Sequence, residues 1–95
     1  MFSLLPFAAS DLQNRELTDR EMLRLAIMAE LDAINLYEQI ASVTEDIDLK
    51  KVMLGVAKEE KTHVGEFQAM LLRFDEEQAQ ELEAGGKEAG EITAA

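Results

Sequence analysis

Two stretches of the chain repeat apolar residues at the spacing of an α-helix, and only a short segment separates them. Each stripe has a period near 3.6, which places its members on one face of a helix. The first contains Leu23, Ala26, Ile27, Glu30, Ala33, Ile34, Tyr37 and Ile40, and the second contains Met53, Val56, Glu60, His63, Phe67, Met70, Leu71 and Phe74. The pattern predicts an all-α fold built on an antiparallel two-helix hairpin.

Capping residues indicate where the two long helices begin. Thr18 to Glu21 reads T-D-R-E, a capping box, and predicts the start of a helix that runs to about residue 41. The segment SVTEDID, residues 42–48, is rich in capping residues and acids. We expect it to form a tight turn and to open the second helix, with its carboxylates favourably placed at the positive end of the helix dipole.

A short third helix is expected after the hairpin. Asp75 predicts its cap, and Gly85-Gly86 predicts its end, so the helix should cover about residues 76–84. We therefore divide the chain into an N-terminal arm (1–17), a helical domain (18–86) and a C-terminal tail (87–95). The arm begins MFSLLPF and is interpreted as a segment that packs on the domain or on a partner.

Length and charge limit the partners. A chain of 95 residues forms one domain whose single core is small, so a second subunit is an economical way to complete its burial. With 20 acidic and 9 basic residues the net charge is −11. This charge argues against nucleic acid and anionic membranes as partners and favours cations. The N-terminal apolar run lacks the basic flank of a signal peptide and is too short to span a bilayer, so we expect an intracellular protein.

Three polar residues interrupt the apolar stripes: Glu30 on the first, and Glu60 with His63 on the second. A buried carboxylate needs a partner, a proton or a cation. Residues three apart project from the same side of a helix, so Glu60 and His63 can converge on one metal ion, with Glu30 opposite. The chain has no cysteine, which leaves oxygen and imidazole as ligands.

One chain supplies half of the ligand set known from dinuclear carboxylate bundles, which is a Glu from each of two helices and a Glu-x-x-His from each of two others. A symmetric dimer would complete a two-metal site near its two-fold axis. Iron, manganese and zinc all suit these ligands, and the residues alone do not choose among them. The alternative is a structural histidine that hydrogen-bonds Glu60 inside a helical dimer.

Two further residues are candidates near this site. Tyr37 lies two turns from Glu30 on the same stripe, where its phenol either packs in the core or hydrogen-bonds a metal-bound carboxylate. Asp32 lies beside the ligands on another helix face. It is either an ordinary solvated charge or a carboxylate that draws metal ions towards the site.

The segments LRLAIMAELDAINLYEQIA (23–41) and AKEEKTHVGEFQAML (57–71) resemble the encapsulated ferritin family, most of all the ferritin-like domain that some archaea carry fused to an encapsulin shell protein. The similarity covers roughly residues 20–90. It implies a dimer that forms a ferritin-like four-helix bundle, with Glu30, Glu60 and His63 of both subunits as di-iron ligands and Tyr37 beside them. Manganese, zinc or calcium could replace iron in a crystal.

The resemblance also implies an activity and a location. The protein would be a ferroxidase that oxidises Fe(II) to Fe(III) with dioxygen. Its dimers would assemble as an annular decamer of five dimers, a cytoplasmic protein held within an encapsulin nanocompartment, where it would act in iron storage and detoxification. Asp32 matches an acidic uptake position, whereas Ala29 replaces a second acid there. No shell-targeting peptide is recognisable after Gly86, so encapsulation would depend on a fusion partner.

Two other functions remain open from the sequence. One is a non-catalytic helical oligomer that binds divalent metal, or a cargo module that only packs against a shell. The other is an oxidase of the rubrerythrin type that uses peroxide. Those proteins usually carry two Glu-x-x-His motifs in a longer chain and a cysteine-rich domain, and neither is present in this sequence.

Overall fold

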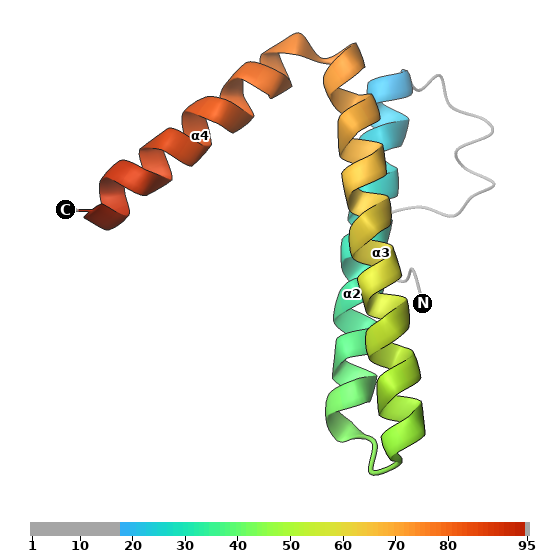
Figure 1. The fold of residues 1–95 in the computed structure, drawn as a ribbon. Helices are drawn as coiled ribbons and strands as arrows, with labels where there is room; N and C mark the ends of the chain where they lie inside the picture. Colours follow the sequence, from blue (N-terminus) through green and yellow to red (C-terminus); the bar gives the residue numbers. More distant parts are fainter. Residues whose placement is uncertain (1–17, 95) are drawn as a thin grey trace.

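The protein is an antiparallel helical hairpin from which a third helix projects (Figure 1). The computed structural model describes residues 18–94, so the predicted arm at 1–17 lies outside the described range. Helix α2 (Asp19–Val43) and helix α3 (Ile47–Phe74) lie side by side and are joined by a short turn. Helix α4 (Glu76–Ala94) leaves from the opposite end of the hairpin. The predicted all-α class and the hairpin are confirmed.

Side-chain caps start all three helices at the predicted positions. The Thr18 hydroxyl accepts a hydrogen bond from the Glu21 backbone N–H (3.3 Å). The Asp46 carboxylate accepts one from the Leu49 N–H (2.8 Å) and starts α3. The Asp75 carboxylate accepts one from the N–H of residue 78 (3.0 Å) and starts α4. Each cap satisfies an amide that the helix itself leaves free.

The hairpin packs through a seam of small residues. Ala33, Ala41 and Ala57 are almost completely buried, and Ile34 and Leu71 complete the buried core of the described residues. Alanine side chains allow two helix backbones to approach closely, which brings the polar members of the two stripes within reach of each other. All members of the first predicted stripe are buried or half-buried. The second stripe is exposed at its end, where Met70 and Phe74 remain open to solvent.

Helix α4 is longer than the sequence predicted. It continues through Gly85 and Gly86 to Ala94, so the expected stop at this glycine pair is wrong. A glycine ends a helix when it adopts a positive φ, and among the described residues no glycine does so. The flanking residues are mostly Glu, Ala and Lys, which are good helix formers and outweigh the cost of two glycines.

Much apolar surface stays open along the hairpin. Exposed large side chains on α2 and α3 include Met28, Leu31, Val52 and Leu54. These side chains lie off both predicted stripes, so the exposed apolar faces are not the faces that the stripes predicted. Within residues 18–94, none of the helices combines the length and the apolar character needed to cross a membrane.

Candidate metal centre

The three polar residues of the stripes lie at the same level of the hairpin. Glu30 lies near the middle of α2, and Glu60 and His63 lie one turn apart near the middle of α3. Because the helices run antiparallel and their faces are fixed by the alanine seam, these side chains point into one region between them. One ligand atom from each residue lies within 4.8 Å of the other two. Within residues 18–94 this is the single group of three or more such side chains.

Distances in this cluster fit a shared ion better than direct hydrogen bonds. The Nδ1 atom of His63 lies 3.6 Å from Oε2 of Glu30 and 3.7 Å from Oε2 of Glu60. Both separations exceed the usual hydrogen-bond length of about 2.7–3.2 Å. A divalent ion with bonds of about 2.1 Å to each ligand allows ligand atoms to lie up to about 4.2 Å apart. The two separations that involve His63 are within this limit, and the three ligand atoms together lie within 4.8 Å of one another, so the cluster approximates the spacing of a coordination site.

Burial and hydrogen bonding point the same way. The side chains of Glu30 and Glu60 are only 18% and 19% exposed, whereas that of His63 is 43% exposed. The Oε2 atom of Glu30 is buried, and among the described residues it has no hydrogen-bond partner. A buried carboxylate oxygen without a partner is costly, and a bound cation would remove that cost. The residues present therefore fit a divalent metal.

Two basic side chains of the hairpin pair with carboxylates outside the cluster. Lys61 pairs with Glu38 at 2.8 Å on the surface of the hairpin. Arg24 pairs with Asp75 at 2.6 Å where α4 begins. Neither pairing neutralises the two glutamates of the cluster, so their negative charge is available to a cation.

The other two candidate residues are placed differently. Asp32 lies outside the group that can share one ion, but its Oδ2 atom is buried and has no hydrogen-bond partner within residues 18–94. Tyr37 is half-buried on α2, two turns beyond Glu30 on the same stripe, and it takes part in an interaction of its own. The roles of both residues at a metal site stay predictions.

Sequence reasoning missed one interaction that shapes the fold around the site. The Arg24 guanidinium binds Asp75, which is 6% exposed and also caps α4. The backbone hydrogen bond from Gln78 lowers the pKa of Asp75, and Arg24 lowers it further, while burial opposes both. Arg24 lies off the apolar stripe, so the stripe did not indicate this ion pair. The signal that could have indicated it was the antiparallel hairpin, which places the start of α2 beside the end of α3.

Comparison with known proteins finds a consistent set of relatives. The EncFtn-like family matches residues 7–85. A ferritin-like-encapsulin shell fusion protein from Pyrococcus furiosus is 60% identical over 73 residues, which are 77% of this chain and 21% of that protein. Encapsulin nanocompartment cargo protein EncC from Myxococcus xanthus is 43% identical over 68 residues, which are 68% of this chain and 52% of that protein.

A solved structure supports the same assignment. The crystal structure of the encapsulated ferritin domain from Pyrococcus furiosus superposes with a TM-score of 0.78 at 50% sequence identity, covering 96% of this chain and 86% of that one. The chain spans about a fifth of the fusion protein and about half of the cargo protein. The family match extends over most of the chain, from before α2 into α4. This chain belongs to the EncFtn-like family.

Proposed function

We propose that this protein is a ferroxidase that oxidises Fe(II) to Fe(III) with dioxygen at a di-iron site formed across a subunit interface. The observation that carries the proposal is the convergence of Glu30, Glu60 and His63, whose ligand atoms lie within 4.8 Å of one another. Iron is the substrate here. The two carboxylates would hold Fe(II) and compensate the charge it gains on oxidation, and His63 would supply a nitrogen ligand.

A second copy of the chain is part of the proposal, because one hairpin supplies only three ligands. The 43% exposure of the His63 side chain means that the cluster opens to one side of the hairpin. A two-fold partner placed there would contribute the same three residues and complete the ligand set of a two-metal carboxylate bundle. It would also cover part of the apolar surface that α2 and α3 leave open.

The chemistry needs two metal ions side by side. Two Fe(II) ions give up one electron each, and dioxygen accepts both electrons with two protons to leave as hydrogen peroxide. The residues of this chain bind and orient the substrate ions. Tyr37 would hydrogen-bond a ligating carboxylate, and the unpartnered Oδ2 of Asp32 would attract incoming cations.

The biological setting is proposed from the relatives. One is named a fusion of a ferritin-like part to an encapsulin shell, and the other a nanocompartment cargo protein. We infer that this chain likewise acts with an encapsulin shell, as an annular decamer of five dimers in the cytoplasm that delivers ferric iron for storage and detoxification.

The proposal is tested by aerobic addition of Fe(II) while ferric absorbance and oxygen consumption are followed. Glu30→Gln, Glu60→Gln and His63→Ala should each lose most of the activity, because each removes a ligand from both halves of the site. Glu38→Gln is the matched control, since it removes a surface carboxylate of α2 that pairs with Lys61. Wild-type rates in all three site variants would overturn the proposal.

A second candidate is a non-catalytic metal-binding oligomer or packing module. It is favoured by one observation: a single chain already brings three ligand atoms within 4.8 Å of one another without a partner. Under this alternative, the wild-type protein would bind Fe(II) and Glu60→Gln would not. Oxygen consumption would stay at the background rate in both. The same experiment therefore distinguishes the two functions.

A further inference from the structure

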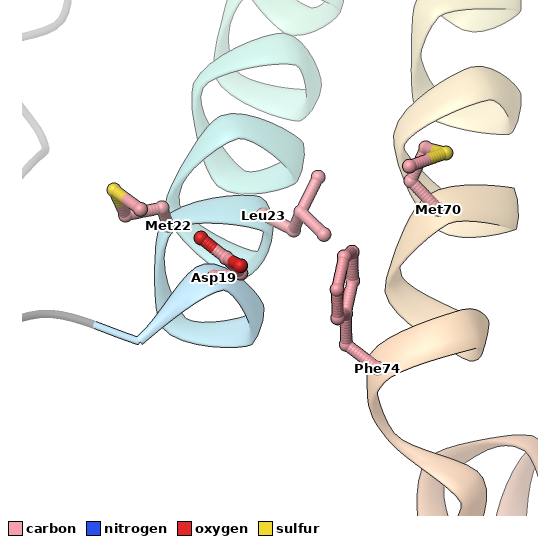
Figure 2. Close-up of a pocket in the computed structure, with 5 residues that line it drawn as sticks. All are labelled: Asp19, Met22, Leu23, Met70 and Phe74. Atoms are coloured by element: carbon pink, nitrogen blue, oxygen red, sulfur yellow. The ribbon is translucent and has the colours of Figure 1, made fainter.

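An apolar groove lies at the end of the hairpin opposite the turn, about two helical turns from the metal-ligand cluster. It has a volume of about 390 Å³ and is lined by Asp19, Met22 and Leu23 of α2 and by Met70 and Phe74 of α3. Figure 2 shows that Leu23 and Phe74 point toward one another between the two helices. A hollow of this size holds one or two large apolar side chains.

The groove is the place where the second predicted stripe stays uncovered. Leu71 on this stripe is 5% exposed, but its neighbours Met70 and Phe74 are 39% and 48% exposed, and Met22 across the groove is 46% exposed. Apolar area of this kind is less favourable in water than when it is buried. Adjacent exposed apolar side chains around a hollow indicate a surface that another apolar segment covers.

We propose that the groove is occupied by the apolar N-terminal segment of the same chain, MFSLLPF at residues 1–7. The first reason is position. Asp19 lines the groove and Thr18 caps α2, so the chain that precedes the helix joins it at the rim of the groove. The segment needs only to fold back over the helix end from which it departs.

Length and composition support the same occupant. Ten residues, 8–17, separate the apolar segment from Thr18 and can span up to about 33–36 Å when extended. The segment offers Phe2, Leu4, Leu5 and Phe7, and it carries no charged side chain. Phenylalanine side chains also make favourable contacts with methionine sulfur, and two methionines line the groove.

Occupation of the groove has a structural consequence. Phe74 is the last residue of α3, and the next residue, Asp75, caps α4 and binds Arg24. A segment packed on Phe74 would exclude water from this junction and strengthen the nearby ion pair, because charges interact more strongly where the local dielectric is low. The N-terminal segment would thus stabilise the end of the hairpin at which α4 begins.

Paramagnetic broadening of methionine methyl signals tests the proposal. The chain has no cysteine, so Ser10→Cys gives one attachment point for a nitroxide label just after the apolar segment. With ¹³C-methyl methionine, we expect loss of the Met22 and Met70 signals. Met53 is the internal control, since it lies 17 residues before Met70 on α3, about 26 Å along the helix.

Two further samples decide which segment binds. The arm variant Phe2→Ser/Leu4→Ser/Phe7→Ser leaves the groove intact and should clearly reduce the loss of both signals, because the label is then held near the groove only by its flexible tether; loss equal to that with the wild-type arm would overturn apolar docking. In a co-refolded mixture, the nitroxide sits on chains without ¹³C and the other chains carry ¹³C-methionine. We expect no loss there, because the segment binds its own chain. Loss in the mixture would identify the arm of a second copy as the occupant. Intact Met22 and Met70 signals in every sample would mean that this segment does not bind the groove. Either result overturns the proposal.

Discussion

The two helices of the hairpin and α4 are all regular α-helices, but different interactions stabilise them. Helices α2 and α3 hold each other through Ala33, Ala57 and Leu71, whereas α4 has no buried residue. Figure 1 shows α4 leading away from the hairpin. Its attachment consists of the Asp75 cap and the ion pair between Arg24 and Asp75. Packing therefore stabilises the first two helices, and local backbone preference stabilises the third.

The difference matters for function because both regions are acidic. Helix α4 carries Glu76, Glu77, Glu81, Glu83, Glu88 and Glu91, yet the three-residue cluster with metal-ligand spacing lies on the hairpin. Packing brings Glu30 and Glu60 together in a half-buried position, while the glutamates of α4 stay exposed to solvent. Acidic residues by themselves give only a negatively charged surface. They form a candidate metal site where helix packing brings them together and partly away from water.

The largest expected difference between the regions concerns two leucines. Leu71→Ala in α3 should lower the free energy of unfolding by about 2–5 kcal/mol, because it leaves a cavity at a nearly buried position. Leu82→Ala in α4 removes the same atoms from a side chain that is 43% exposed and should change stability by less than about 0.5 kcal/mol. Urea unfolding of the metal-free chains at one protein concentration measures both. Equal costs would show that α4 is packed in solution.

Metal binding should raise the free energy of unfolding by a similar amount, and this gain should depend on a glutamate of the hairpin and not on one of α4. Mn(II), which binds the same ligand types as Fe(II), should raise the free energy of unfolding by about 2.7 kcal/mol at about 100 times its dissociation constant. Glu60→Gln should abolish most of this gain, because it removes a ligand of the cluster. Glu81→Gln on α4 has the same charge change and should keep the gain. A loss in Glu81→Gln equal to that in Glu60→Gln would mean that Mn(II) responds to overall charge.

A smaller, pH-dependent effect is expected at the junction of the two regions. The pKa of Asp75 is lowered in the folded state from its ordinary value of 3.8, first by the Gln78 hydrogen bond and then by Arg24. The stabilising contribution of its charge is therefore complete above that value and is lost as the pH falls through the lowered pKa. Asp75→Asn keeps the capping oxygen and removes the charge.

We expect Asp75→Asn to be less stable than wild type at neutral pH and to approach it below pH 3.8, in urea unfolding at a series of pH values. Glu88→Gln, which removes an exposed charge from the middle of α4, is the control and should show a smaller gap at neutral pH. A gap for Asp75→Asn that stays constant with pH would show that its charge adds no stability.

Local signals made most of the fold predictable. Thr18, Asp46 and Asp75 start helices because a side-chain oxygen satisfies the first free amides, and this rule depends on a few neighbouring residues. The spacing of Glu60 and His63, with Glu30 on the facing stripe, was enough to predict that they converge. Helix period and antiparallel pairing determine both features.

Features that depend on distant contacts or on a second molecule could not be read in this way. The pairing of Arg24 with Asp75 joins residues 51 positions apart and follows from the exact level at which the helices pack. The glycine pair of α4 was misread because a stop requires a left-handed conformation that the sequence permits but does not impose. The two-subunit site that we propose would leave only half of its ligands in the chain.

The smallest expected effect tests whether α4 is isolated in solution. A Cβ added at Gly86 meets nothing within 4 Å, and the residue lies inside a helix with normal backbone angles. Gly86→Ala should therefore stabilise α4 by up to about 1 kcal/mol, which slows amide hydrogen exchange within α4 by up to about fivefold. Exchange in α2 should be unchanged, because α4 contributes no packing to the hairpin core. Faster exchange in α4 would mean that another backbone approaches Gly86 closely in the assembled protein, and the third helix would then be held by packing in the same way as the hairpin.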